Sequence, residues 1–472
     1  DGHDFAAKAN AAGAVALLVE RPLGLGVPEV EVASVRAAMG PIAARFNGDP
    51  TRELKVVGVT GTNGKTTTAY LVRALLEAAG IQTGLLGTVT SIVGGVEWPV
   101  ERTTAEAIDL EADFRAMLDG GDEACAMEVS SHALALGRTG GIRFAAAVFT
   151  NLTQDHLDFH QTMEDYFQAK RRLFLTEPGV SVVNVGDPYG RRLAGEIEGA
   201  VTFGVEAAGL EATAGLEADY RATDLRCDAS GCEFELRTPA GVREVALKMP
   251  GRFNVANAVG ALATVHALAE AGRRRSSAAI RVAAEDLDTL IGALERGVKV
   301  PGRFEPVDCG QGFGVLVDYA HTPDSLENVL RSARDLTKGR ILCVFGAGGD
   351  RDRGKRPLMG EIAARLADVA VVTSDNPRSE SPEKIVGEIL AGIPDGEGLE
   401  NGSTHVEIDR KAAIEIAIGL ARPEDVVVIA GKGHEQGQEL AGGVKVPFDD
   451  AAVAREVLGA RGEQASAGAD RT

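Results

Sequence analysis

The sequence predicts an α/β protein in which a mostly parallel sheet is followed by a second α/β domain of doubly wound type. Strand-like apolar runs alternate with helical patterns over residues 55–166 and again over 315–430, which is typical of parallel sheets with helices on both faces. A glycine-rich loop at 60–68 joins a strand to a helix. Short alternating runs at 180–250 predict an antiparallel excursion between the two parts. The chain has 472 residues, and at roughly 100–200 residues per domain about three domains are expected.

The pattern of residues 1–50 predicts a short N-terminal α/β segment that resembles the C-terminal half of an α/β unit. Buried strands are expected at 15–19 and 30–32, and helical spacing runs over 35–46. The turn-forming residues at 47–50 mark the boundary with the next domain.

Residues 51–298 form the predicted central domain, and 299–460 the predicted C-terminal, Rossmann-like domain. The central elements are expected at 55–59, 125–129, 145–149, 232–236 and 254–271, together with a helix that follows the glycine-rich loop and runs through residue 79. The C-terminal elements are expected at 315–317, 325–336, 341–345, 357–366, 369–373 and 426–430. Small and polar residues predict a disordered tail at 461–472.

The charge balance excludes one class of function. The chain has 49 Lys and Arg against 69 Asp and Glu, a net charge of −20, whereas nucleic-acid-binding domains are basic. An anionic small molecule can still bind, because a site needs only a local cluster of cations.

The five cysteines are scattered and form no CxxC pair, which predicts reduced thiols in a cytoplasmic protein. Cys227 and Cys232 flank a predicted turn and could meet across a hairpin, but free thiols are the favoured interpretation. No apolar run approaches the ~20 residues that span a bilayer, and the chain shows no leader sequence.

The strongest local motif is Gly61-Thr62-Asn63-Gly64-Lys65-Thr66-Thr67. A glycine-rich turn before a helix presents backbone N–H groups to phosphates, Lys65 offsets the β/γ charge, and Thr66 can reach Mg²⁺. The spacing departs from the strict GxxxxGK[ST] pattern, because position 59 is Val. A purely structural glycine turn is the alternative.

Two further groups of polar residues follow predicted strands. Glu128 ends one strand, where a carboxylate can hold Mg²⁺ beside a phosphate chain. The segment 150–160 contains Asp155, His156, Asp158 and His160 just after another strand, which indicates a second metal or proton-handling position.

These motifs, taken in order, resemble those of the Mur ligases, the ATP-dependent amino-acid ligases of peptidoglycan synthesis, and within them the MurE type. The resemblance rests on the glycine-rich loop and on four further segments, which are Glu128 to His132, Asn151 to His156, Asp318 to Pro323 and Gly431 to Glu435. It implies a three-domain α/β ligase, with residues 1–50 as the end of a longer, UDP-binding N-terminal domain.

The resemblance implies a reaction in which ATP phosphorylates a carboxylate and an amine attacks the acyl phosphate. Making a peptide bond needs a better leaving group than oxide, and cations must offset the repulsion between carboxylate and triphosphate. Lys65, Glu128, His156 and Lys170 are then the catalytic residues, and Thr66, Glu128, His156 and Lys170 hold Mg²⁺. Lys170 matches the lysine that family members carry as a CO₂-derived carbamate, which turns a cation into a metal-binding carboxylate.

The same resemblance implies the substrates and their contacts. ATP contacts are implied at Asn254, Asn257, Arg303, Asp318 and His321 as well as at residues 61–67. The UDP-N-acetylmuramoyl-L-Ala-D-Glu contacts are Thr103, Thr104, Ser130 and Arg138. Meso-diaminopimelate is implied by the Asp-Asn-Pro-Arg run, and its pocket would contain Arg351, Asp375, Asn376, Arg378, Gly431 and Glu435.

Within that pocket, Arg378 offers a planar fork for a carboxylate, and Asp375 and Asn376 offer acceptors for an ammonium group. The alternative for the Asp-Asn-Pro-Arg run is a turn without function. The alternatives for the protein are a ligase that adds lysine and a folylpolyglutamate synthetase-like ligase. Outside the family, the glycine pattern Gly346-Ala347-Gly348-Gly349 after a strand is also compatible with a nicotinamide-dependent oxidoreductase. A binding protein without catalytic activity is a third interpretation. We expect a monomer with no nucleic-acid or membrane partner.

Overall fold

The computed structural model describes residues 2–206, 217–274, 287–394 and 403–469. The described chain divides into two compact units, here called unit 1 and unit 2. Unit 1 is drawn from residues 1–204, 218–220 and 260–290, and unit 2 from 205–217, 221–259 and 291–472. The predicted domain boundaries near residues 50 and 298 stay predictions.

Unit 1 is built on part of an 11-stranded sheet of the described residues, in which the strands β10-β9-β8-β3-β7-β4-β5-β6 follow one another. The pairs from β10 to β4 are parallel, and β5 and β6 are added antiparallel. The strands are β3 (Lys55–Thr60), β4 (Thr83–Leu86), β5 (Ser91–Val93), β6 (Val96–Trp98), β7 (Ala124–Glu128), β8 (Phe144–Phe149), β9 (Val180–Asn184) and β10 (Val201–Val205). A separate parallel pair is formed by β1 (Leu17–Val19) and β2 (Glu29–Glu31).

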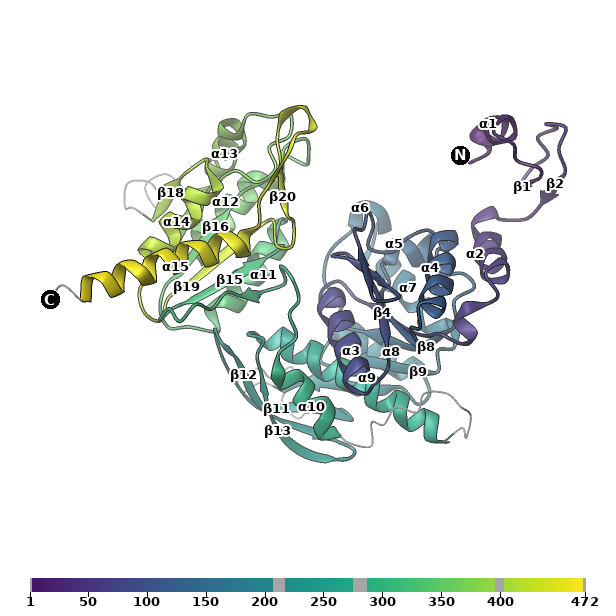
Figure 1. Ribbon diagram of the computed structural model, residues 1–472, viewed down its shortest axis with the longest axis horizontal. Helices are drawn as coiled ribbons and strands as arrows, with labels where there is room; N and C mark the ends of the chain where they lie inside the picture. Colours follow the sequence, from purple (N-terminus) through teal and green to yellow (C-terminus); the bar gives the residue numbers. More distant parts are fainter. Residues whose placement is uncertain (1, 207–216, 275–286, 395–402, 470–472) are drawn as a thin grey trace. The chain divides into compact units, whose positions relative to one another are not determined.

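Helices join these strands, as the βα alternation predicts (Figure 1). They are α1 (Ala6–Ala11), α2 (Val35–Phe46), α3 (Lys65–Ala78), α4 (Ala107–Asp119), α5 (Ser131–Ala135), α6 (Leu157–His160), α7 (Met163–Arg171) and α8 (Pro188–Glu196). Short 3₁₀ turns lie at Gly2–Phe5, Pro50–Arg52 and Phe174–Thr176. The core combines strand residues with side chains of α4, α5, α7 and α8, among them Phe114, Phe149 and Phe167.

Unit 2 contains an antiparallel meander and a doubly wound sheet. The meander strands are β11 (Tyr220–Asp228), β12 (Gly231–Thr238) and β13 (Gly241–Leu247). The second sheet has the order β14-β15-β19-β16-β17-β18 and is parallel except for β14. Its strands are β14 (Glu305–Pro306), β15 (Gly314–Asp318), β16 (Ile341–Phe345), β17 (Val369–Val372), β18 (Thr404–Val406) and β19 (Val426–Ala430).

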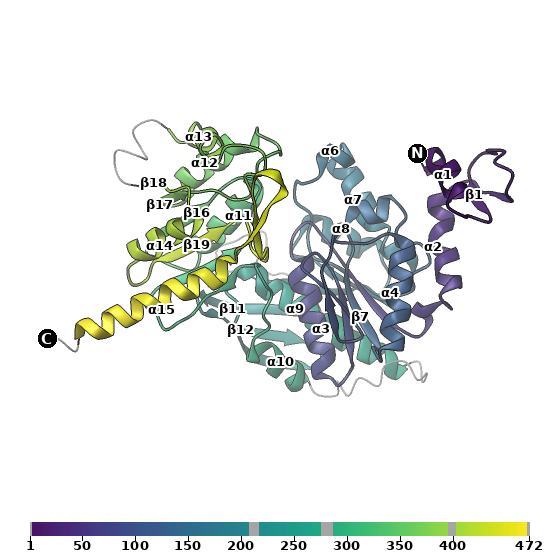
Figure 2. The same ribbon diagram turned by 45° about the horizontal axis from the view of Figure 1, so that its top comes forward.

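Helices cover both faces of this second sheet. Alternate residues of β16 enter different cores: Cys343 packs with side chains of α11, α12 and α13, and Val344 packs with those of α14 and α15. Figure 2 shows α12 and α13 on one side of the strands and α14 and α15 on the other. The helices of this sheet are α11 (Pro323–Arg334), α12 (Lys355–Leu366), α13 (Pro382–Leu390), α14 (Arg410–Leu420) and α15 (Asp450–Ala469). Two further helices, α9 (Arg252–Arg274) and α10 (Leu287–Arg296), follow the meander in the chain. A small hairpin pairs β20 (Gly437–Glu439) with β21 (Lys445–Pro447), around a 3₁₀ turn at Ala441–Gly443.

One expectation about a chain segment is wrong. The antiparallel excursion does not occupy all of residues 180–250, because β9 and β10 continue the parallel sheet. A short apolar run such as Val180–Asn184 carries no information about the direction of its neighbour. Helix α15 extends to Ala469, and the predicted disordered tail at 461–472 stays a prediction.

The interpretation of Cys227 and Cys232 as free thiols is also wrong. The two residues are partners in the β11–β12 register, with their Cα atoms 4.1 Å apart, and they form a disulfide. Side chains that face each other across an antiparallel pair lie on the same side of the sheet, so the turn brings the two sulfurs together.

We expect a thiol count to reveal this bond. Unfolded but unreduced protein should expose three reactive thiols, those of Cys125, Cys309 and Cys343, and reduction should raise the count to the five of the whole chain. The Cys227→Ser variant should give the same count before and after reduction. Five thiols without reduction would contradict the pairing.

Candidate functional site

The glycine-rich loop between β3 and α3 is held by the segment that follows β8. The Thr62 N–H donates to Asn151 O at 2.9 Å, and the Asn63 N–H donates to Asn151 Oδ1 at 2.9 Å. Gly64 starts the helix with a φ of 84°, which suits glycine. A Cβ on Gly61 would lie 1.9 Å from Thr150 Oγ1. The loop is therefore shaped by contacts that only glycine permits, and the N–H groups at the start of α3 lie at its end.

Two lysines converge on this loop. Lys65 Nζ donates to Gly61 O at 3.0 Å and to Thr62 O at 2.7 Å. Lys170, in α7, is 1% exposed, and its Nζ donates to the same Gly61 carbonyl at 2.8 Å. Burial first, and then the charge of Lys65, hold the pKa of Lys170 well below its usual value.

A cluster of aromatic and imidazole rings lies beside Lys170. Tyr166 places its ring 4.5 Å from Lys170 Nζ, and its hydroxyl lies 3.2 Å from Thr62 Oγ1. The ring centroids of His132 and His156 are 4.9 Å apart, and His160 stacks on Tyr166 at 5.0 Å.

Two histidines of this cluster, His156 and His160, have lowered pKa values. Burial, opposed by Asp155 and supported by His132, lowers the pKa of His156. Burial and the neighbouring His132 lower the pKa of His160 to about 4. A neutral imidazole retains a lone pair with which it can bind a metal or accept a proton.

Glu128, at the end of β7, is 1% exposed and faces the start of the segment after β4. Its Oε1 accepts from the Thr88 N–H at 2.7 Å, and its Oε2 accepts from the Thr88 hydroxyl at 3.1 Å. A Cβ on Gly87 would lie 2.5 Å from Oε1. In the part of the chain that the structure describes, no group of three His, Cys, Asp or Glu side chains is close enough to hold a metal by itself.

The residues implied for the sugar-nucleotide substrate form a connected set around Thr104. Thr104 Oγ1 donates to Glu128 O at 2.9 Å and accepts from the Ser130 N–H at 3.1 Å. Arg138 donates to Thr104 O at 3.1 Å and pairs with Glu106 at 2.9 Å. Thr103 Oγ1 lies 3.1 Å from Thr88 Oγ1, which links this set to the Glu128 carboxylate.

Apart from residues 61–67 of the glycine-rich loop, the residues implied for the nucleotide lie in unit 2. The Arg303 guanidinium lies 5.0 Å from the centre of the Tyr319 ring, and its buried Nε has no hydrogen-bond partner. Asp318 accepts from the Phe304 N–H at 2.7 Å, and burial raises its pKa although Arg303 opposes the shift. His321 Nδ1 lies 2.8 Å from Tyr319 O.

The two asparagines implied for the nucleotide are tied to their own helix start. Asn254 is fully buried, and its Nδ2 donates to Pro250 O at 2.8 Å. Asn257 Nδ2 donates to Asn254 Oδ1 at 3.4 Å. Both side chains thus fix the first turns of α9.

The predicted amino-acid pocket is formed by loops at the carboxyl ends of β16, β17 and β19, where open parallel sheets bind ligands. Arg378 has a φ of 51°; its Nε donates to Glu439 at 2.8 Å and its Nη1 to Gly349 O at 2.8 Å. A Cβ on Gly431 would lie 2.6 Å from Asp375 Oδ2. The Arg351 Nη1 donates to Asp350 O at 3.2 Å.

Asn376 does not offer its oxygen as a free acceptor. Its Oδ1 accepts from Lys432 Nζ at 2.9 Å and from the Glu439 N–H at 2.9 Å, while its Nδ2 donates to Glu435 at 2.8 Å. The sequence analysis expected an acceptor at this position, whereas in the structure the Asn376 oxygen already accepts two hydrogen bonds.

Several residues of these sites were missed by the sequence analysis. They are His132, Tyr166, Lys432 and His434. His132 and the pair Lys432 and His434 lie inside the segments that carried the resemblance, so their position was a usable signal. Tyr166 shares a helix face with Lys170 at i, i+4 spacing.

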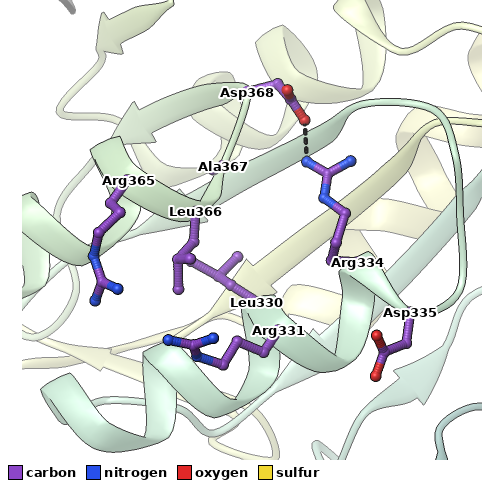
Figure 3. Close-up of a pocket in the computed structure, with 8 residues that line it drawn as sticks. All are labelled: Leu330, Arg331, Arg334, Asp335, Arg365, Leu366, Ala367 and Asp368. Carbon is purple, nitrogen blue, oxygen red and sulfur yellow. Dashed lines mark hydrogen bonds and ion pairs between the residues drawn. The ribbon is translucent and has the colours of Figure 1, made fainter. Parts of the chain in front are cut away.

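A surface cavity of about 480 Å³ in unit 2 contains none of these residues among those that line it (Figure 3). Its cations are balanced: Arg334 pairs with Asp368 at 2.5 Å, and Arg331 and Arg365 both pair with Glu327. The cavity lies beside the start of β17, whereas ligands bind at the carboxyl ends of such strands.

Comparison with known proteins agrees with the resemblance. The family model of the Mur ligase middle domain matches residues 59–265, and that of the Mur ligase, glutamate ligase domain matches residues 302–433. A UDP-N-acetylmuramoyl-L-alanyl-D-glutamate--2,6-diaminopimelate ligase of Geobacillus kaustophilus (strain HTA426) is 46% identical over 98% of this chain and 90% of its own. The protein of the same name from Streptomyces coelicolor is 47% identical over 97% and 87%.

A solved structure of a protein with that name has the same fold. It aligns with a TM-score of 0.68 and 33% identity, and covers 97% of this chain and 89% of its own. With this fold and with sequence identity that extends over nearly the whole chain, the protein belongs to the Mur ligase family.

Proposed function

We propose that the chain is an ATP-dependent acid–amino-acid ligase. It adds meso-2,6-diaminopimelate to UDP-N-acetylmuramoyl-L-alanyl-D-glutamate and releases ADP and phosphate, a step of peptidoglycan precursor synthesis. The observation that carries the proposal is the convergence of Lys65 and Lys170 on the Gly61 carbonyl in the glycine-rich loop. The similarity to ligases of that name supports the choice of substrates.

The proposed reaction has two steps. An oxygen of the substrate carboxylate attacks the γ-phosphorus of ATP, and the bond from phosphorus to the β,γ-bridging oxygen breaks, so that ADP leaves. The amine of the incoming amino acid then attacks the acyl carbon, loses a proton, and displaces phosphate. Lys65 and the N–H groups at the start of α3 offset the charge that builds on the transferred phosphoryl group.

The side chains of unit 1 fit the Mg²⁺ that Mur ligases use with ATP. Glu128 and Thr66 offer hard oxygen donors, and His156 offers a neutral nitrogen. Mg²⁺ prefers to complete its shell with phosphate oxygens and water, so a site without three acidic or imidazole ligands of its own is consistent with it. Bound there, the ion would neutralise phosphate charge; Glu128 and His156 would hold it in place.

We further propose that Lys170 carries a carbamate. The low pKa that burial imposes favours the neutral amine, and only the neutral amine attacks CO₂. A density map of protein kept near neutral pH with bicarbonate should show the added carboxylate on Nζ. With ¹³C-labelled bicarbonate, a carbamate resonance should appear in the natural chain and vanish in Lys170→Arg. A bare amine under these conditions would contradict the assignment.

The remaining contacts follow the resemblance. Asn254, Asn257, Arg303, Asp318 and His321 would contact ATP. Thr103, Thr104, Ser130 and Arg138 would contact the sugar-nucleotide peptide. Arg351, Asp375, Asn376, Arg378, Gly431 and Glu435 would bind diaminopimelate. We place the protein in the cytoplasm as a monomer. None of the described helices has the length and apolar character needed to cross a membrane.

Phosphate release from ATP tests the proposal. The assay contains UDP-muramoyl dipeptide and offers diaminopimelate, L-lysine or L-glutamate in turn. Release that depends on diaminopimelate is the expected result. A preference for lysine would refute the specificity alone, and turnover with folate substrates would favour the folylpolyglutamate synthetase-like alternative.

A further inference from the structure

Lys432, in the loop after β19, is a fully buried cation at the proposed amino-acid pocket. Its Nζ donates to Asn376 Oδ1 at 2.9 Å and to Glu435 Oε2 at 3.1 Å. Removing an ammonium group from water is unfavourable unless polar partners compensate it. Here both partners belong to the predicted diaminopimelate pocket, so the cation is held where it can act on that pocket.

The first consequence concerns the orientation of the Asn376 amide. Its Oδ1 accepts from Lys432 Nζ and from the Glu439 N–H at 2.9 Å, which fills both lone pairs of that oxygen. The Nδ2 then donates one hydrogen to Glu435 Oε2 at 2.8 Å. The second hydrogen is available to an acceptor, so Asn376 presents a donor to the pocket.

The second consequence concerns Glu435. Its Oε2 accepts from both Lys432 and Asn376, and the side chain is 35% exposed. The carboxylate is therefore anchored through one oxygen, while Oε1 can turn toward a ligand. A carboxylate oxygen attracts an ammonium group.

We propose that Lys432 is a positioning residue for the amino-acid substrate. It fixes Asn376 as a donor and Glu435 as an anchored acceptor, a pair that matches the carboxylate and the ammonium of an α-amino-acid head group. Lys432 itself acts through these two side chains. The proposal rests on the proposed function, since it assumes that the pocket binds an amino acid.

Steady-state kinetics of Lys432→Met test this role. Methionine keeps the length and apolar stem but removes the charge. Loss of charged hydrogen bonds is expected to raise the KM for diaminopimelate by about 10–150-fold, with the KM for ATP unchanged. Lys411→Met is the matched control, because Lys411 lies on the surface of the same unit and pairs with Glu456. It should leave both constants as they are.

A double-mutant cycle separates positioning from a general structural role. In the Asn376→Ala background, Lys432→Met should raise the KM for diaminopimelate much less than in the natural chain, because one of its two partners is gone. Additive effects, or an equal rise in the KM for ATP, would overturn the proposal.

Asn376→Asp provides an independent check if Lys432→Met does not fold. It keeps the acceptor for Lys432 but removes the N–H donor, so the KM for diaminopimelate should rise. An unchanged KM would overturn the orientation that we infer. If the natural chain prefers lysine, the specificity of the proposed function fails but Lys432→Met should still raise the KM for lysine. If it uses no amino acid, both proposals fail.

Discussion

Lys65→Ala is expected to lower the rate of phosphate release by at least about 10²–10³-fold, because the developing charge on the transferred phosphoryl group loses its nearest cation. In the structure the Lys65 ammonium is bound by the carbonyls of Gly61 and Thr62. These contacts keep the side chain over the glycine-rich loop before a nucleotide arrives. The Lys65→Ala variant should lose turnover and retain its fold.

The matched control is Lys55→Ala. Lys55 begins the same strand, β3, but belongs to neither the loop nor the helix that follows it. Phosphate release and the thermal unfolding midpoint should be measured for both variants. If Lys65→Ala turned over at the natural rate, the assignment of the loop to ATP would fail.

Asp450→Ala is expected to destabilise unit 2 by about 3–5 kcal/mol, since it leaves a buried arginine without its counter-ion. Arg410 and Asp450 are both fully buried and form two parallel hydrogen bonds, at 2.8 and 2.7 Å. The same guanidinium donates to Ala430 O at 3.0 Å. The pair joins α14 to the first turn of α15 and to the end of the central strand β19.

Glu456→Ala is the control for this prediction. Glu456 pairs with Lys411 at 2.7 Å and also joins α15 to α14, but both side chains are exposed, so about 0–1 kcal/mol is expected. Denaturant unfolding followed by a probe in unit 2 measures both variants. If both variants lost equally little free energy of unfolding, the buried pair of Arg410 and Asp450 would contribute no more to stability than the exposed pair of Lys411 and Glu456, and the prediction would be wrong.

The sequence predicted the central strands well because strands that are buried on both faces are continuous apolar runs. The expected strands at 341–345 and 426–430 coincide with β16 and β19. The sequence also indicated the glycine-rich loop, because the composition of such a loop is set by local backbone requirements. The fold class and the family that these motifs predicted are confirmed.

Features that depend on contacts between distant residues were not predicted. Lys170 lies 109 positions from the carbonyl that it contacts, and no local pattern distinguishes it from an exposed helical lysine. The direction of β9 depends on which strand lies beside it, and the Asn376 amide is oriented by donors 56 and 63 residues away.

The sequence alone determined the order of strands and helices, the glycine-rich loop and the family, because these follow from hydrophobic periodicity and from short motifs with local physical causes. Only the tertiary structure decided which charges are buried, which lysines meet at Gly61 and which side chains the Asn376 amide contacts. Burial and hydrogen bonding arise when distant segments pack together, and the energies of these contacts are absent from any local stretch of sequence.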